Sequence, residues 1–300
     1  MADSLSRASK HAPTALVAGG LFLLGVADGG YGTETFAVVA ILSWAGVLAR
    51  LVFGLGAPRG LPGSAAALGA CLVALSLLAA FSAGWAADDG RALDEAIRVA
   101  GYAGIFVLCV LSMRVGDGRR WLAGVAIGCA AIVSWALLGR LLPSLPGGDE
   151  ELAAFLPSAR GRLSAPIGYW NGLAAVAAIA VVSLGWLASE ADSLWARVAS
   201  AAMLPACGLT MYLTSSRGGF AAALVGLAVL VAIAPRRARL AGGALLGAGG
   251  AALLIALAAS RDDLVDGLGT EVADNQGLQL LMFTLAVSLA VGLARWACDR

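Results

Sequence analysis

Long apolar stretches alternate with short polar connections along the whole chain. A bilayer core about 30 Å thick is crossed by a helix of about 20 apolar residues. Ten stretches approach this length, so the pattern predicts about ten transmembrane helices. They lie at about residues 14–30, 36–56, 64–86, 96–113, 121–142, 171–189, 195–214, 217–235, 239–259 and 276–296. The predicted fold class is an all-α integral membrane protein, with residues 1–300 forming one polytopic membrane domain.

Composition supports the same class. Hydrophobic residues make up 60% of the chain, charged residues make up 13%, and the mean hydropathy is +0.87. Soluble domains are about half apolar and about a quarter charged, so this chain is not expected to be one. The formal net charge of +1 provides no basic footprint for nucleic acid, which is therefore excluded as a partner. Membrane lipids are the expected surroundings.

The first apolar stretch follows Arg7 and Lys10 and ends at Asp28. A basic segment before a short apolar one is typical of a signal peptide. We interpret it as an uncleaved signal anchor, because no clear small-x-small cleavage site precedes a soluble domain. Removal as a cleaved signal peptide remains the alternative.

Basic residues indicate the orientation of the helices. If the N-terminus is cytoplasmic and the helices alternate, thirteen of the 20 basic residues fall on the inner side. Inner connections carry an excess of Lys and Arg, so both termini are predicted to be cytoplasmic, N-in and C-in. The longest connection, at about 143–170, then lies on the outer face. We expect one short interfacial helix in it, at about 149–156.

Residue usage gives a hint about the source. Lys10 is the only lysine among the 20 basic residues, and Ala and Gly are abundant. This bias is typical of a GC-rich genome, so we expect a multi-pass protein of a bacterial cytoplasmic membrane. Gly243 and Gly247 form a small-xxx-small pattern, which predicts close packing of two helices.

Histidine and cysteine indicate no metal site. His11 is the only histidine, and none of the five cysteines has CxxC spacing. Four of these cysteines fall inside apolar stretches, where a small buried residue is the ordinary interpretation. Neither a metal ion nor a cofactor is predicted.

Seven arginines fall on the outer face, where the positive-inside rule disfavours them. They are Arg91, Arg98, Arg140, Arg160, Arg162, Arg217 and Arg261. An arginine at bilayer depth costs on the order of 3 kcal/mol, and such charges usually face a cavity or a partner. Arg98 lies in the first turns of the fourth predicted helix, and Arg140 lies near the outer end of the fifth. Both are candidates for binding an anionic substrate.

Arg217 provides the strongest case for an anion site. It stands at the start of the eighth predicted helix, after a serine pair (215–216) suited to N-capping and before a glycine pair (218–219). The glycines leave backbone N–H groups uncovered, and a helix N-terminus with a guanidinium suits a phosphate or pyrophosphate. Arg160 and Arg162 could reach the same anion from the long outer loop.

Simpler interpretations of these arginines remain open. Arg217 can extend toward the headgroups and only anchor a hairpin. Arg160 and Arg162 can pair with the acidic run at 149–151 on a solvated loop. The first interpretation needs no ligand, and the second uses up the positive charge of the loop.

Three further residues near this loop also have two interpretations. Tyr169 and Trp170 stand where interfacial aromatic residues are expected, so membrane anchoring competes with substrate stacking. Asn171 is most simply the N-cap of the sixth predicted helix, and it is also a candidate for binding a substrate.

Two motifs together resemble the O-antigen ligase and polymerase family of bacterial envelope proteins. They are residues 161–174, GRLSAPIGYWNGLA, and residues 213–219, LTSSRGG. The first matches the family's polar loop leading to Asn-Gly at a helix start, and the second matches its Ser-Arg-Gly helix start. The helical pattern from about 64 to 259 is similar to the family's core.

The resemblance implies a metal-independent membrane glycosyltransferase. Its donor is a saccharide on a polyprenyl pyrophosphate at the outer face, and its acceptor is a glycan or a lipid. Arginines of the family bind the pyrophosphate and stabilise it as it leaves, which implies Arg217 and Arg162 as catalytic residues here. The expected substrate-binding residues are Arg160, Tyr169, Asn171, Ser216, Arg140 and Arg98.

The chain departs from the family in its late outer segment. Family members have about twelve helices and a large late outer loop, which in the ligases carries a histidine. Here that segment covers only about 260–275 and has no histidine. Its acidic residues can supply a base or can simply be solvated. A binding or transport protein for an anionic lipid-linked substrate, or a scaffold subunit, is therefore the alternative function.

Overall fold

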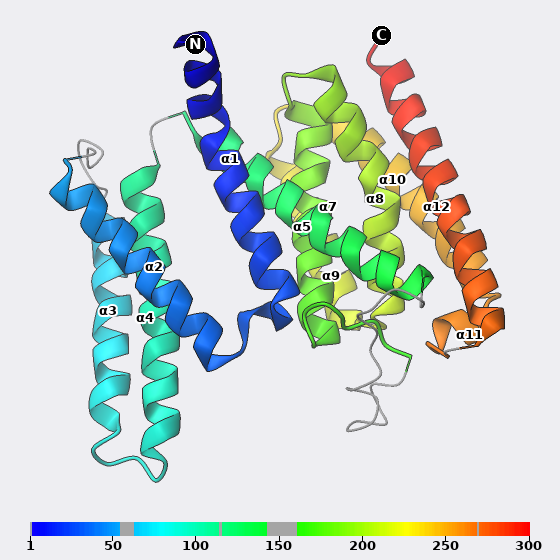
Figure 1. The fold of residues 1–300 in the computed structure, drawn as a ribbon. Helices are drawn as coiled ribbons and strands as arrows, with labels where there is room; N and C mark the ends of the chain where they lie inside the picture. Colours follow the sequence, from blue (N-terminus) through cyan, green and yellow to red (C-terminus); the bar gives the residue numbers. More distant parts are fainter. Residues whose placement is uncertain (1, 55–62, 114–115, 143–160, 269) are drawn as a thin grey trace. The chain divides into compact units, whose positions relative to one another are not determined.

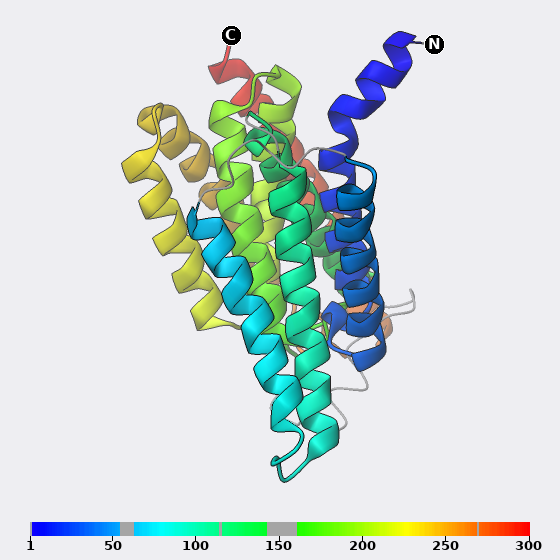
Figure 2. The ribbon, with the colours of Figure 1, turned by 90° about the vertical axis from the view of Figure 1, so that its left-hand side faces the viewer.

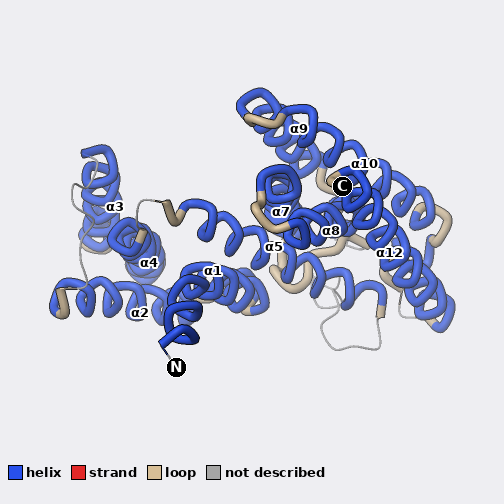
Figure 3. The backbone as a smooth tube through the Cα atoms, turned by 90° about the horizontal axis from the view of Figure 1, so that it is seen from above, coloured by secondary structure: helices blue, strands red, loops and turns tan. Residues whose placement is uncertain are grey.

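The computed structural model of the protein describes residues 2–54, 63–113, 116–142, 161–268 and 270–300, with side chains from residue 12 onward. Every regular element in these ranges is a helix (Figure 3). The interfacial helix expected at 149–156 lies outside the described residues.

The elements follow one another along the chain as Figure 1 shows. They are α1 (Ala2–Val26), η1 (Asp28–Gly30), α2 (Thr33–Val52), α3 (Gly63–Ser82), α4 (Asp89–Ser112), α5 (Gly118–Leu141), α7 (Trp170–Glu190), α8 (Leu194–Leu213), α9 (Arg217–Ile233), α10 (Arg237–Ala258), α11 (Asp262–Val265) and α12 (Glu271–Cys298). Each of the ten predicted apolar stretches forms a helix, which confirms the all-α class.

Capping residues extend some helices beyond their apolar part. Asp88 accepts a hydrogen bond from the backbone N–H of Arg91 at 2.9 Å, so α4 begins in a polar turn ahead of the apolar stretch predicted at 96–113. Thr270 caps α12 in the same way through the N–H of Ala273, at 3.1 Å. Hydropathy locates the apolar part of a helix, and the cap decides where the helix starts.

Eight helices in the described part of the chain are long and apolar enough to cross a membrane. Two further apolar helices are shorter, namely α9 and the Ala12–Val26 part of α1. Large apolar side chains on these helices face outward, as Leu42, Leu245 and Leu285 do. Such extensive exposed apolar surface requires a partner other than water. These features define a multi-pass membrane protein.

The described contacts divide the chain into two compact units. The first contains residues 1–29 and 120–300, and the second contains residues 30–119. The expectation of one polytopic membrane domain remains a prediction beside this division. The two units are described separately below.

In the unit of residues 30–119, α4 packs against both α2 and α3, and Figure 2 shows α3 and α4 side by side. The indole N–H of Trp44 donates to the carbonyl of Ala100 at 3.0 Å, and Arg50 donates to the carbonyl of Leu111 at 2.9 Å. A Cβ at Gly104 would collide with Ser43, so glycine is what permits this close contact of α2 and α4.

In the larger unit, α8 is the central helix, because it packs against α7, α10 and α12. The core between these helices includes Leu173, Leu209, Leu254 and Leu280, each 0% exposed. α9 lies against α7 and α10, and α5 approaches α1 at Gly124. This core holds the ends of α7, α8 and α9 in fixed positions relative to one another.

Small residues on α10 allow it to approach α8 closely, which confirms the predicted close packing at Gly247, whereas Gly243 faces Arg295 of α12 in ordinary contact. A Cβ at Gly247 would lie 2.7 Å from the Cβ of Leu204, and one at Gly250 would lie 2.8 Å from the ring of Pro205. Gly249, on the same helix, has no atom within 4 Å of such a Cβ. Close packing is therefore a property of one face of α10.

Gly247→Ala is expected to destabilise the protein, because the added methyl group forces α10 and α8 apart. Overpacking of this kind costs about 1–3 kcal/mol. Thermal unfolding of the purified protein in detergent measures the effect. Gly249→Ala is the matched control on the same helix and should leave the unfolding temperature unchanged or raise it. Equal behaviour of the two variants would contradict the packing described for α10.

Candidate functional site

Residues 161–174 and 213–219, the two motifs of the sequence, meet in the structure. The backbone N–H of Leu163 donates to the carbonyl of Leu213 at 2.9 Å. The hydroxyl of Ser216 donates to Oδ1 of Asn171 at 2.8 Å. A Cβ at Gly219 would lie 2.6 Å from the Cβ of Ala174. The start of α7, the end of α8 and the start of α9 therefore form one site, which we call the motif site.

The turn between α8 and α9 is shaped by three polar residues. Thr214 is fully buried, and its hydroxyl donates to the carbonyl of Met211 at 2.7 Å. Ser215 has a φ of 52°, in the left-handed region that favours glycine. Ser216 then caps α9, because its Oγ accepts from the N–H of Gly219 at 3.2 Å. The predicted N-cap role of Ser216 is confirmed.

The segment that precedes α7 is fixed by its apolar side chains. Leu163 and Ile167 are buried, at 1% and 6% exposed. The carbonyl of Ser164 accepts hydrogen bonds from Ile167 and Gly168, both at 3.1 Å, and Gly168 has a φ of 75° that suits glycine. The peptide bond between Ala165 and Pro166 is cis. This segment is thus an ordered turn held by the core.

The predicted N-cap role of Asn171 is wrong. The N-cap of α7 is Tyr169, without a side-chain capping bond, and Asn171 is the second residue of the helix. Its side-chain amide donates to the hydroxyl of Tyr169 at 2.8 Å and accepts from Ser216. Asn171 therefore links α7 to α9 through a tertiary hydrogen bond and does not cap α7.

Two of the predicted cationic residues lie in the motif site. The guanidinium of Arg162 lies over the ring of Trp170, 5.1 Å from its centroid. Arg217 is the exposed first residue of α9. Neither forms an ion pair with any carboxylate in the described ranges of the chain. Arg162 contacts Trp170, which precedes Asn171, and Arg217 follows Ser216. The Asn171–Ser216 hydrogen bond therefore places both arginines in the same site.

The connection predicted at about 143–170 is described from residue 161 onward. Arg160 and the acidic run at 149–151 lie outside the described residues. Tyr169 is 42% exposed and stacks at a tilt on Trp170, with ring centroids 5.2 Å apart. An exposed aromatic pair beside Arg162 fits either membrane anchoring or contact with a ligand.

The glycine pair at the start of α9 differs in its two positions. Gly219 is required by the close approach of α7, and its N–H donates a hydrogen bond to the hydroxyl oxygen of Ser216. A Cβ at Gly218 would meet nothing within 4 Å. The backbone beside Arg217 is thus open at Gly218 only, whereas the sequence predicted that both glycines leave N–H groups uncovered.

Arg140 has a structural set of contacts. Its side chain is buried, and Nη1 donates to the carbonyls of Gly161 at 3.1 Å, Leu264 at 3.3 Å and Val265 at 3.1 Å. The guanidinium therefore joins the end of α5 to the start of the 161–174 motif and to α11. We assign it to positioning this segment, while its predicted contact with a substrate remains untested.

Arg98 belongs to the other unit. It pairs with Glu95 one turn earlier on α4, at 2.5 Å, and lies 5.4 Å from the centroid of the Phe36 ring. Its guanidinium is thus engaged by an acid and an aromatic ring within residues 30–119.

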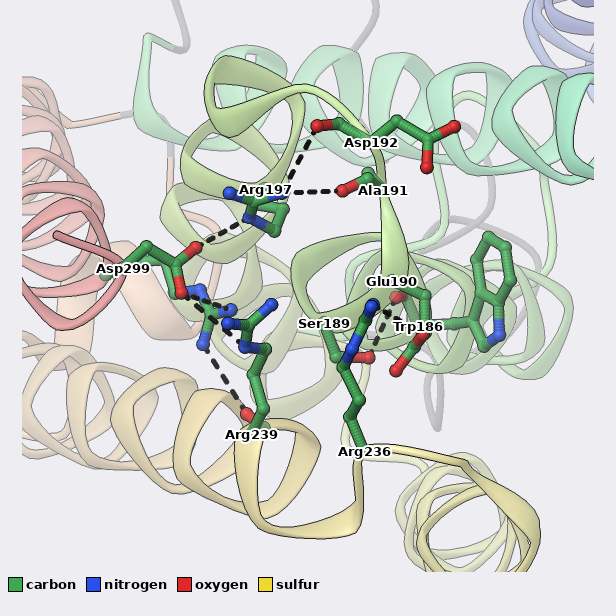
Figure 4. Close-up of polar contacts among 10 residues, drawn as sticks. Trp186, Ser189, Glu190, Ala191, Asp192, Arg197, Arg236, Arg239 and Asp299 are labelled. Carbon is green, nitrogen blue, oxygen red and sulfur yellow. Dashed lines mark hydrogen bonds and ion pairs between the residues drawn. The ribbon is translucent and has the colours of Figure 1, made fainter.

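A second polar cluster was missed as a site by the sequence interpretation. It lies at the opposite end of α7, where α7, α8, α10 and α12 bring together charged residues (Figure 4). Glu190 pairs with Arg236 at 3.0 Å, and Asp299 pairs with Arg197 at 2.6 Å. The sequence used these arginines only to orient the helices. Their partners are about 40 to 100 residues away, so no local motif marks them.

No group of three or more His, Cys, Asp or Glu side chains that could hold a metal ion occurs in the described part of the chain. What the motif site offers chemically is a pair of guanidinium groups, the start of a helix, and hydroxyl and amide groups. Such a set suits the binding of phosphate oxygens. No family model, no curated protein and no solved structure matches this chain.

Ser216→Ala is expected to lower stability, because it removes both the cap of α9 and the link to Asn171. The loss of an N-cap side chain costs about 1–2 kcal/mol. The measurement is the thermal unfolding temperature in detergent. Ser215→Ala is the control, since Ser215 is exposed and its side chain has no described hydrogen bond. If both substitutions lower the temperature equally, the Ser216–Asn171 link does not hold the helix ends.

Arg140→Met is expected to destabilise the protein more strongly than the loss of an exposed arginine. Each buried carbonyl left without a donor costs about 1–3 kcal/mol. Arg217→Met serves as the control, because Arg217 is exposed and has no described partner, and it should leave the unfolding temperature nearly unchanged. A thermally unaffected Arg140→Met protein would show that the three carbonyl contacts are not structural.

Proposed function

We propose that this protein is a membrane glycosyltransferase similar to O-antigen ligases and polymerases. Its donor is a saccharide on a polyprenyl pyrophosphate, and its product enters cell-surface polysaccharide or glycoconjugate assembly. The observation that carries the proposal is the meeting of the two motifs, joined by the Asn171–Ser216 hydrogen bond. This bond holds Arg162 and Arg217 at one site without an acidic partner among the described residues.

The two arginines are assigned to the pyrophosphate. A guanidinium presents several donors in a planar fork that matches phosphate oxygens, and each charge-assisted hydrogen bond contributes about 1.5–3 kcal/mol. Positive charge held in place before the reaction stabilises the negative charge that develops on the leaving pyrophosphate. Arg217 and Arg162 carry this role. Asn171, Ser216 and Tyr169 supply hydrogen-bonding groups beside them.

The acceptor side of the reaction requires a base for the attacking hydroxyl. The late outer segment offers carboxylates, and one of them, Asp263, accepts a hydrogen bond from Thr270 at 2.9 Å. α11 lies in this segment and is joined to the start of the 161–174 motif through Arg140. These contacts support a role for the segment near the site, and we assign no single carboxylate as the base.

The proposal includes a membrane orientation. About ten spans with both termini inside would place the motif site on the outer face of a bacterial cytoplasmic membrane. The arginines at the opposite end of α7 support this arrangement, because Arg197, Arg236, Arg239 and Arg295 then fall on the inner side. Donors flipped to the outer leaflet would reach Arg217 there.

A second candidate function is a non-catalytic protein that binds or transports an anionic lipid-linked substrate. The late outer segment favours it, since the described part between α10 and α12 consists of one short helix and turns. That segment has no histidine. The same arginines would serve this function, and the absence of any new glycosidic bond in the presence of donor and acceptor would distinguish it.

Arg217→Ala is expected to weaken binding of a polyprenyl-pyrophosphate-linked sugar at least about tenfold, equivalent to about 1.4 kcal/mol. The measurement is a binding titration of the purified protein in detergent. Arg237→Ala is the matched control, because Arg237 is also the exposed first residue of a helix, at the other end of the unit. We expect it to bind as the unmodified protein does.

Two results would overturn the assignment. One is the absence of donor binding by the unmodified protein, and the other is equal binding by both variants. If binding depends on Arg217, incubation with donor and acceptor decides between the two candidates. Formation of a glycosidic bond supports the transferase, and tight binding without product supports the binding or transport protein.

A further inference from the structure

The cluster at the end of α7 opposite the motif site contains more positive than negative charge. Four guanidinium groups lie there with two carboxylates, and Figure 4 labels three of the arginines and both acidic residues. The guanidiniums are those of Arg197, Arg236, Arg239 and Arg295, and the carboxylates are those of Glu190 and Asp299. The carboxylate of Asp192 points away from the cluster in the figure. Two positive charges therefore remain in excess.

Asp299 is shared by three of the arginines. Arg197 approaches it at 2.6 Å, Arg295 at 3.1 Å and Arg239 at 3.6 Å, while the side chain of Asp299 is only 2% exposed. The single negative charge of Asp299 offsets only one of the three positive charges around it. Like charges held this close repel one another unless a further anion joins them.

Arg295 shows the deficit most clearly. Its side chain is 4% exposed, and its Nε and Nη2 atoms are buried without a hydrogen-bond acceptor. The contact of Nη2 with Asp299 is close in distance but is not aligned as a hydrogen bond. Buried donors are almost always satisfied in native proteins, so these two N–H groups call for a further acceptor. Arg295 therefore presents donors to an anion within the cluster.

The cluster is also open to an incoming ligand. Arg239 and Arg236 are 38% and 56% exposed, so they form its accessible side. α8 and α10 begin beside the cluster, whereas α7 and α12 end there. The two pairs of helix dipoles oppose each other, so the guanidinium groups carry the attraction. Basic pockets between membrane helices are suited to phosphate-bearing lipid headgroups.

We propose that Arg197, Arg239 and Arg295 form a binding site for a phosphate group, either on the headgroup of an acidic lipid or as a free anion. The site lies at the far end of α7, whose 21 residues span about 30 Å. It is therefore distinct from the motif site and does not depend on the proposed transferase function. A phosphate would neutralise the excess charge and accept hydrogen bonds from Arg295 and Arg239.

The test is a titration of the purified protein in a non-ionic detergent, followed by its thermal unfolding. The probes are short-chain phosphatidylglycerol, short-chain phosphatidylcholine and inorganic phosphate. We expect phosphatidylglycerol to raise the unfolding temperature in a saturable way and phosphatidylcholine to leave it unchanged. If inorganic phosphate raises it equally, the site takes a free anion, and if it does not, the site takes a lipid headgroup.

Arg239→Gln is the informative variant, because Arg239 is partly exposed and makes only the long contact with Asp299. Its apparent affinity should fall by about tenfold or more, as expected for the loss of one charge-assisted hydrogen bond. Arg237→Gln removes the same charge two residues away, outside the cluster, and should bind as before. Arg239→Lys provides a second variant that retains the charge, and we expect it to bind with an intermediate affinity.

The proposal is overturned if no phosphate-bearing probe stabilises the unmodified protein. It is also overturned if Arg239→Gln and Arg237→Gln lose affinity equally, because the effect would then be one of overall charge.

Discussion

The hydrogen bond from Ser216 to Asn171 is the contact on which the candidate site depends. It joins the first turns of two helices that are separated along the chain by the whole of α8. Its geometry is possible only because Gly219 lets α9 approach Ala174. The bond therefore needs three things together, namely a capping serine, an amide in the first turn of the neighbouring helix, and a glycine in the first turn of α9. Each is ordinary alone, and their combination places the arginines.

A membrane restricts how a chain can satisfy the backbone polar groups around such a site. Inside a bilayer every backbone polar group must be satisfied within the protein. Non-helical backbone such as the 161–169 segment is tolerated where protein surrounds it, and here Leu163 and Ile167 anchor it in the core while Arg140 binds the carbonyl at its start. A buried guanidinium is thus an alternative to water for satisfying the carbonyls of a loop, and it explains an arginine that topology alone would disfavour.

The fold was largely predictable from the sequence, whereas the site was predictable only in part. Apolar stretches can be recognised locally, so each of the ten predicted stretches forms a helix, and the cap at Ser216 was found because its partner is three residues away. Asn171 was misassigned because its partner lies 45 residues away. The same limit hid the ion pair of Arg197 with Asp299, 102 residues apart. Contacts between neighbouring residues can be predicted from the sequence, but pairing over long sequence distances depends on how α7, α8, α10 and α12 pack.

The order of donors across the motif site has a consequence for Tyr169. The N–H of Gly219 donates to Ser216, the hydroxyl of Ser216 donates to Asn171, and the amide of Asn171 donates to the oxygen of Tyr169. Every link points the same way, so each hydroxyl along the row has its proton direction fixed by the one before it. The row ends at the phenol, whose own proton is left uncommitted on an exposed ring. Within the described part of the chain, the row of hydrogen bonds thus leaves the phenolic O–H of Tyr169 able to donate to a group outside the row.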